Sequence, residues 1–205
     1  MSRTSVDAGQ LNEMVQVITL REEPGDVWTW QTVRRACASV ELSTARSLFS
    51  EVGIGARAAE LVLRRQELTL HNALLWGGQH LFLTAIVPEG RTFLRVQAAL
   101  VQPVACLAVR TKNTLGAGNR PVSAEAMRVQ FPGVLTEKYV KYEREDTHAE
   151  TETAYVLVTP KQIELEAGDL VTVQDGPAKA QYNVTAAHVL DPFKNEYEMV
   201  YRGDV

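Results

Sequence analysis

The sequence predicts a mainly β protein: two tandem small antiparallel β-barrel or sandwich modules with long loops and little helix. Three observations support this class. The stretch Trp76–Gln97 has the pattern of a hairpin, because Gly77 and Gly78 favour a tight turn and an apolar strand follows them. A looser copy of the same pattern, Asp175–Arg202, closes the chain. No stretch has the apolar period of a long amphipathic helix.

Both hairpins can be placed in detail. The first has an apolar strand at Leu81–Val87 and a return strand at Arg91–Val96, separated by Pro88-Glu89-Gly90. The second has strands at Gln181–Ala186 and Tyr197–Arg202. Each hairpin contains a Thr-Ala pair, Thr84-Ala85 in the first and Thr185-Ala186 in the second. The second hairpin is longer than the first by about three residues before this pair and by about six after it. A single pair of strands is not stable alone in water, so each copy needs further strands before it.

The preceding sequence supplies such strands to the first hairpin. Leu11–Arg21 alternates between two partly apolar faces, as a strand buried on both sides does. After a turn at Glu22–Asp26, a long strand is expected over Trp28–Leu42. Strand-like sequence resumes at Glu60–Arg65 and at Glu67–Leu70 before the hairpin begins.

Composition limits the possible functions. The chain has 205 residues, of which 45% are hydrophobic and 22% charged, as expected for one large or two small soluble domains. The net charge of −4 argues against nucleic-acid binding through a basic face. Residues 1–110 carry a net charge of +1 and residues 111–205 a net charge of −5, so complementary patches would favour specific association.

The expected compartment is a reducing cytoplasm. Cys37 and Cys106 share no motif and are predicted to be reduced thiols. Met1–Gln10 lacks the apolar region of a signal peptide, and no apolar run is long enough for a membrane span.

The predicted domains are residues 1–110 and 123–205, joined by a linker at residues 111–122 that is rich in glycine and poor in bulky side chains. The first module contains a long loop over residues 43–59, in which Ser43 can cap a short helix at Thr44–Glu51. Loops of this length in compact domains are usually functional or disordered. The candidate contact residues of this loop are Leu48, Phe49, Val52, Gly53, Ile54 and Gly55.

A second, charged loop is predicted between strands at Glu137–Arg144 and Thr153–Val158. Its acidic side chains are Glu145, Asp146, Glu150 and Glu152. Their spacing lacks the alternation and the glycine of a calcium loop, so a solvated acidic loop is favoured over a metal site.

The sequence predicts no catalytic site, no bound metal and no cofactor. His71, His80, His148 and His188 are scattered, and His71 and His80, nine residues apart across a turn, lack a nearby set of cysteine or carboxylate ligands. The HExxH, CxxC and GxSxG patterns are absent. A non-catalytic role in assembly is favoured, with a small enzyme of unrecognised site as the remote alternative.

Several motifs of the first half occur in the same order in a known family. They are Leu11-Asn12-Glu13-Met14-Val15, then Trp30 followed by Arg34-Arg35-Ala36-Cys37-Ala38-Ser39-Val40-Glu41, then Leu48-Phe49, and finally Trp76-Gly77-Gly78-Gln79-His80-Leu81-Phe82 before Arg91–Leu100. This half resembles the head–tail joining proteins (head-closure or stopper proteins) of long-tailed bacteriophages. The second half, from Ala167-Gly168-Asp169-Leu170 to Tyr201-Arg202-Gly203-Asp204, resembles the end of related head-completion proteins. Family members are commonly single modules of about half this length, and the aromatic residue expected near Cys37 is missing here.

The resemblance implies a structural protein of the virion neck, assembled in the host cytoplasm. Such proteins form a ring, commonly of six subunits, between a portal–adaptor ring above and a tail terminator or tail tube below. They retain packaged DNA, which otherwise only passes through the lumen, and they dock the tail. The tier within the neck stays open, as do a tail-terminator, baseplate or other virion adaptor ring as alternatives.

Overall fold

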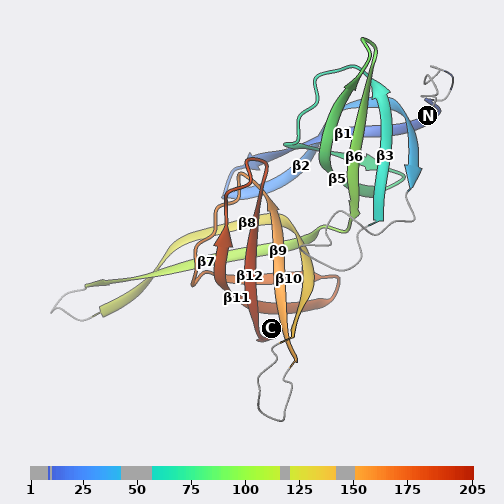
Figure 1. Ribbon diagram of the computed structural model, residues 1–205. Coiled ribbons are helices and arrows are strands. Elements are labelled where there is room, and N and C mark those ends of the chain that lie inside the picture. Colours follow the sequence, from blue (N-terminus) through green and yellow to red (C-terminus); the bar gives the residue numbers. More distant parts are fainter. Residues whose placement is uncertain (1–8, 10, 43–56, 116–120, 142–150) are drawn as a thin grey trace. The chain divides into compact units, whose positions relative to one another are not determined.

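The computed structural model describes residue 9 and residues 11–42, 57–115, 121–141 and 151–205. These residues form strands, turns and loops without an α-helix (Figure 1), so the predicted mainly β class is confirmed. Within them, no helix is long and apolar enough to cross a membrane. The short helix predicted at Thr44–Glu51 lies outside the described residues.

The chain divides into two compact units. Unit 1 consists of Met1–Leu20 and Trp30–Gln102, and unit 2 of Arg21–Thr29 and Pro103–Val205. The hairpin made by the first two strands of the chain is therefore divided. Its turn, within Arg21–Thr29, is assigned to unit 2, and the rest of both strands to unit 1.

Unit 1 contains a six-stranded antiparallel barrel. Its strands are β1 (Glu13–Glu23), β2 (Val27–Leu42), β3 (Arg57–Arg64), β4 (Asn72–Trp76), β5 (Gln79–Glu89) and β6 (Phe93–Val101). They pair in the order β1-β4-β5-β6-β3-β2, and β2 pairs with β1 again, so the ladder closes on itself. The bounds of β2 match the long strand expected at Trp28–Leu42.

The predicted hairpin at Trp76–Gln97 is confirmed. Trp76 lies opposite Gln79, and the two glycines between them have φ angles of 56° and 81°. Two successive positive φ values define the mirror-image turn whose twist suits a hairpin, and glycine adopts them without a steric cost. The return strand β6 then pairs with β5 from Glu89↔Phe93 to His80↔Val101.

The core of unit 1 comes from inward-facing aliphatic side chains of all six strands. Fully buried members include Val15 on β1, Leu61 on β3, Leu74 on β4, Leu81 on β5 and Val96 on β6. The alternation predicted for the first strand holds, since Val15 and Val17 on one face and Ile18 on the other are buried.

Unit 2 contains the other six strands, with the same connectivity. They are β7 (Val104–Leu115), β8 (Pro121–Lys141), β9 (Thr151–Pro160), β10 (Leu170–Asp175), β11 (Ala178–His188) and β12 (Lys194–Asp204). Their ladder runs β8-β7-β10-β11-β12-β9, and β8 pairs with β9 to close the circuit. When the strands of each unit are numbered from one to six along the chain, both circuits read 1-4-5-6-3-2.

The stretch predicted as an inter-domain linker is hairpin in its described part. Residues 111–115 end β7 and residues 121–122 begin β8, and the two strands pair up to Leu115↔Pro121. Glycine and proline are common both in the turns of hairpins and in linkers. Composition alone therefore could not distinguish the β7–β8 hairpin end from an inter-domain linker. The units divide instead between Gln102 and Pro103.

The two predicted hairpins share an irregularity. The register of β5 against β6 shifts between Leu83 and Ala85, and that of β11 against β12 shifts between Val184 and Ala186. In both units the residue skipped by the ladder is the threonine of the Thr-Ala pair, Thr84 or Thr185. A bulge inserts one residue and increases the local twist of a strand, so the two hairpins bend at equivalent points.

Gly133 lies where β8 changes partner. It pairs with Val104 of β7, and the next residue, Val134, pairs with Val158 of β9. A Cβ atom at Gly133 would lie 2.7 Å from Cδ1 of Leu157 and 3.2 Å from Sγ of Cys106, both of which are buried. The bend of β8 therefore brings its backbone against the core at a point where a side chain has no room.

We expect Gly133→Ala to lower the free energy of unfolding by about 1 to 3 kcal/mol, because overpacking a core displaces its neighbours. Leu157→Val shortens the crowded side chain, so it should lower the free energy of unfolding by less in the Gly133→Ala background than in the wild type. Urea denaturation of the two single variants and the double variant measures this coupling. Additive losses would show that the contact is not tight.

Candidate functional site

The residues predicted to make assembly contacts lie mostly outside the described chain. Leu48, Phe49, Val52, Gly53, Ile54 and Gly55 fall within residues 43–56, and Glu145, Asp146 and Glu150 within residues 142–150. Glu152 is on β9, where the backbone alone is described. The topology still relates the two sets. One segment joins β2 to β3 and the other joins β8 to β9, so both connect the second strand of a unit to its third.

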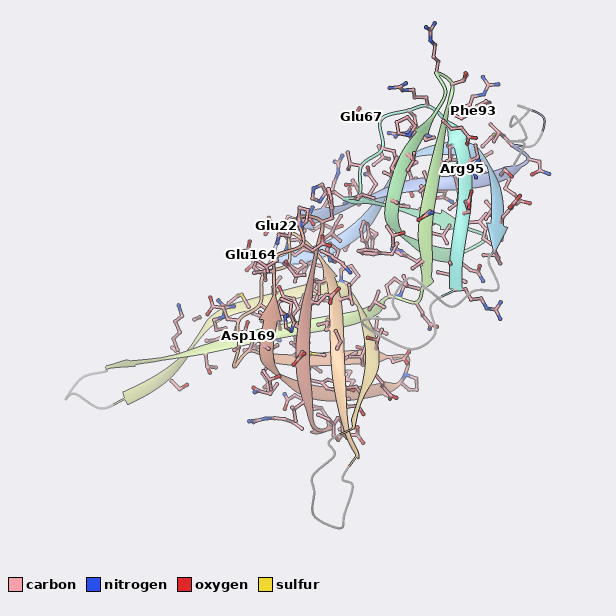
Figure 2. The ribbon with its side chains drawn as sticks, in the orientation of Figure 1. Glu22, Glu67, Phe93, Arg95, Glu164 and Asp169 are labelled. Atoms are coloured by element: carbon pink, nitrogen blue, oxygen red, sulfur yellow. The ribbon has the colours of Figure 1, made fainter. Side chains whose placement is uncertain are left out.

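The described residues form a groove of about 680 Å³ in unit 2. Most of its lining comes from the turn end of the β1–β2 hairpin, the first half of β8, and the segment between β9 and β10. Arg110 on β7, Val189 after β11 and Asn195 on β12 complete it. Figure 2 labels two of its acidic residues, Glu22 and Glu164. The lining residues that carry charge are Glu22, Asp26, Arg110, Arg128, Lys161, Glu164 and Glu166.

The hairpin turn is joined to β8 through the backbone. Val27 pairs in parallel with Gln130, and the Gln130 N–H donates to the carbonyl oxygen of Asp26 at 2.9 Å. Gly25 and Asp26 have φ angles of 92° and 57°, a left-handed pair that reverses the chain. The hydroxyl of Thr29 donates to the Glu23 carboxylate at 2.6 Å and fixes the base of the turn.

The segment after β9 is held by buried polar groups rather than by a ladder. Tyr197 donates its hydroxyl proton to the carbonyl oxygen of Ile163 at 2.7 Å and accepts from the Leu165 N–H at 3.0 Å. The Asn195 amide also donates to Ile163 O, at 2.8 Å, and Lys161 Nζ donates to Asn195 Oδ1 at 3.0 Å. Because the side chains of Ile163 and Leu165 are buried, the segment also contributes to the core. Burial raises the pKa of the Tyr197 hydroxyl, which therefore stays protonated.

An arginine fixes the end of the same segment. Arg110 on β7 forms a two-pronged ion pair with Asp169, with Nε and one terminal nitrogen each 2.7 Å from a carboxylate oxygen. The third nitrogen donates to Glu166 at 2.7 Å. Asp169, which is fully buried, also accepts from the Glu166 N–H at 2.8 Å (Figure 2). The pKa of Arg110 is raised, chiefly by the hydrogen bond to Asp169. Asp169, which belongs to the Ala167–Leu170 motif of the second half, is thus an anchor of the groove wall.

The histidines and cysteines that are described lie apart from the groove. His80 on β5 is buried, with its ring centroid 5.1 Å from that of Trp30, and burial lowers its pKa to about 4. Burial raises the pKa of the Cys106 thiol to about 12, so it is not a thiolate at neutral pH. His188 is exposed and lies 3.4 Å from Glu198. Over the described ranges, no three His, Cys, Asp or Glu side chains are placed to hold a metal ion.

Comparison with known proteins gives little. No protein-family model matches the chain. No curated protein matches it. Among solved structures, the chain is similar to the K. pneumonia MrkH–c-di-GMP complex, with 8% sequence identity and a TM-score of 0.22 over 91% of this chain and 79% of that one. A similarity this low carries no argument about function.

The groove therefore presents a mixed charged rim on a rigid, hydrogen-bonded wall. Its lysine and arginine side chains are engaged: Arg110 by Asp169, Lys161 by Val189 O and Asn195, and Arg128 by Glu125 at 3.6 Å. Such a surface suits contact with another protein segment, since its backbone already pairs with one hairpin turn. Sequence reasoning missed this surface because the segments that line it are far apart along the chain.

We expect Asp169→Ala to lower the free energy of unfolding by about 3 to 5 kcal/mol, because removing the buried carboxylate leaves two nitrogens of Arg110 and the Glu166 N–H without their acceptor. Glu166→Ala is the matched control. Glu166 contacts the same arginine but is largely exposed, so its loss should cost no more than about 1 kcal/mol. Chemical denaturation of both variants measures the difference, and equal losses would contradict the assigned anchor.

Stability should fall in mild acid because of His80. Its pKa in the folded protein is about 4 against 6.5 for a free histidine, so only the unfolded chain takes up a proton between these values. The contribution is fully present above pH 6.5 and is lost as the pH falls towards 4, by about 3 kcal/mol. Denaturation at pH 7 and pH 4.5 should show a smaller difference for His80→Phe than for the wild type. An unchanged difference would mean that His80 is protonated in the folded protein.

Proposed function

We propose that this chain is a ring-forming connector of the bacteriophage neck, a stopper or head-closure protein made of two tandem barrel modules. Its ring, of six copies, would lie under the portal and adaptor, retain packaged DNA and dock the tail. The observation that carries the proposal is the repeated 1-4-5-6-3-2 circuit. It supports reading the chain as one building block used twice, as the family resemblance of both halves suggests.

The positions of the family motifs support the same reading. Leu11–Val15 leads into β1, Arg34–Glu41 lies on β2, and Trp76–Phe82 contains the turn between β4 and β5. The motifs that carry the resemblance are thus the strands and turn that close one barrel. A structural function also agrees with the described polar groups, which hold the chain in place as anchors and ion pairs.

The two long connecting segments are the parts we assign to neck contacts. The segment with Leu48–Gly55 would reach a neighbouring ring or the lumen. The segment with Glu145, Asp146, Glu150 and Glu152 would face the DNA channel or the tail. In the channel, its negative charge would limit adhesion of DNA during passage. Both follow the second strand of their unit, so they would emerge at equivalent places on the two modules.

Deleting Leu48–Gly55 should abolish head–tail joining and leave the protein folded, because the deletion lies between β2 and β3 and removes no strand residue. Infectious-particle titre in a complementation assay measures joining, and thermal unfolding checks the fold. Leu190→Ser is the control: this side chain is 99% exposed in another loop, and its change should leave the titre intact. Full titre with the deletion would overturn the assignment of this loop.

Two further measurements address the proposal as a whole. Native mass spectrometry should find a ring-sized oligomer or a monomer that assembles only on filled heads. Electron cryo-microscopy of the particle should place the chain at the capsid–tail junction. Its presence in a tail-terminator or baseplate ring would favour that alternative, and its absence from the particle would end the proposal.

A further inference from the structure

The hairpin of β1 and β2 shows how a two-stranded turn end can pair with a strand edge. Its turn end, Arg21–Thr29, belongs to unit 2. There Val27, at the start of β2, pairs with Gln130 of β8. The turn end of a first-and-second-strand hairpin thus pairs with the edge of a second strand, β8, within unit 2.

Unit 2 has the equivalent hairpin, and it extends past its own circuit. The last contact of β7 with β10 is Val109↔Leu170, whereas its ladder with β8 continues to Leu115↔Pro121. Figure 1 shows this two-stranded ribbon leaving the rest of unit 2. Where side chains are described beyond Arg110, at Thr111, Lys112 and residues 123–126, all are exposed. Two strands alone are marginally stable in water, so the ribbon is expected to have a partner.

The ladders fix which residues correspond. When the two units are aligned at their bulged residues, Thr84 and Thr185, Gln97 of unit 1 is equivalent to Glu198 of unit 2. Two residues earlier on the same strands, Arg95 is equivalent to Glu196. In unit 1, Arg95 pairs with Val62 of β3, which pairs with Ser39 of β2. In unit 2, Glu196 pairs with Val158 of β9, which pairs with Val134 of β8, so Ser39 and Val134 are equivalent. The same offset along these two strands puts Arg35 at the position of Gln130. It puts Val122 at the position of Val27 when the extra residue of β8, Ala126 in the register shift opposite Arg110 and Thr111, is counted with the rest.

The receiving edge also has its equivalent in unit 1. In unit 2, β8 pairs with β9 only from Val134 onward, and the preceding edge receives Val27 at Gln130. In unit 1, β2 pairs with β3 only from Ala38 onward, and within the described ladders the edge at Arg35 receives no second hairpin.

A groove accompanies this edge in both units. The groove of unit 2 includes Lys161 and Gln162, and that of unit 1, about 440 Å³, includes Arg65 and Gln66, which occupy the equivalent positions after the third strand. The first is lined by the β1–β2 turn, whereas the second is lined by residues of unit 1 alone. The unit 1 groove carries Arg64 and Arg65, and the exposed ribbon carries charges of both signs, Lys112 on β7 and Glu125 on β8.

We infer that the β7–β8 ribbon of one copy docks on β2 of a second copy, with Val122 pairing in parallel with Arg35 as Val27 pairs with Gln130. The contact is head-to-tail, because ribbon and receiving edge are different surfaces, and repeated contacts of this kind close into a ring when the rotation permits. The inference rests on the ring-forming part of the proposed function and names the strands that make the ring.

Cysteine cross-linking tests the register. Two variants, Val122→Cys and Arg35→Cys, each in a Cys37→Ser background, are mixed at the highest attainable concentration and oxidised. Since a disulfide needs Cα atoms within about 7 Å, we expect a covalent dimer from this mixture. The matched control replaces Val122→Cys by Leu190→Cys, which is fully exposed on another loop, and should give only background dimer.

A shortened ribbon provides the second test. Replacing Lys112–Ala124 by Asn-Gly joins Thr111 to Glu125, which already lie opposite each other, through a favourable two-residue turn. This variant should unfold at the wild-type temperature yet remain a monomer under conditions in which the wild type assembles.

The outcomes separate this inference from the proposed function. A ring that forms without the Val122–Arg35 cross-link, or with the shortened ribbon, overturns the docking and leaves the connector proposal standing. A wild-type protein that stays monomeric at every concentration and gives no cross-link also overturns the docking. A cross-linked ring that is absent from the virion neck supports the docking and overturns the connector proposal.

Discussion

Each unit depends on one long strand that pairs with two different neighbours. In unit 2 this strand is β8, which pairs with β7 up to Gly133 and with β9 from Val134 onward. The change of partner lets six strands close into one circuit, while the part of the long strand outside that closure keeps an edge, as β8 does where Gln130 receives Val27. The requirement for glycine follows from it, because the strand backbone turns against the buried Leu157 at this point.

In both units, the segment after the third strand adds apolar side chains to the core. This segment follows β3 in unit 1 and β9 in unit 2. In unit 1, Leu68 and Leu70 pack on the core, and Arg34 donates to Gln66 Oε1 at 2.7 Å and to the carbonyl oxygen of Glu67. In unit 2, Ile163 and Leu165 are buried, and Arg110 holds the end of the segment through Asp169. The two solutions are alike in plan, and the one with the fully buried carboxylate should be the more rigid.

Local chemistry made the hairpins predictable from sequence. Gly77-Gly78 and Gly90 stand where positive φ angles are needed, and strand-forming residues flank them, so β5 and β6 were predicted within a few residues. The strand predicted at Glu67–Leu70 was wrong, because the strand before the turn is β4 at Asn72–Trp76. The threonine of the Thr-Ala pair even aligned the two copies, because it is the bulged residue in both. These features involve neighbours along the chain, which sequence patterns record.

Features that depend on distant residues were not predictable. The glycine- and proline-rich stretch at residues 111–122 suits a linker and a hairpin end equally well, and only the pairing of β7 with β8 distinguishes them. The assignment of Arg21–Thr29 to unit 2, the Arg110–Asp169 anchor and the close approach at Gly133 each join segments far apart in sequence. The predicted loop contacts at Leu48–Gly55 and Glu145–Glu152 remain predictions, because most of these residues lie outside the described chain.

If the chain forms the proposed ring, neighbouring copies must meet head-to-tail, through two different surfaces. A cryo-microscopy reconstruction of the assembled protein measures this directly. We expect a closed ring in which each subunit's β7–β8 ribbon lies along β2 of the next subunit and every junction is the same. A two-fold symmetric dimer, in which one surface meets its own copy, would contradict this view of the molecule.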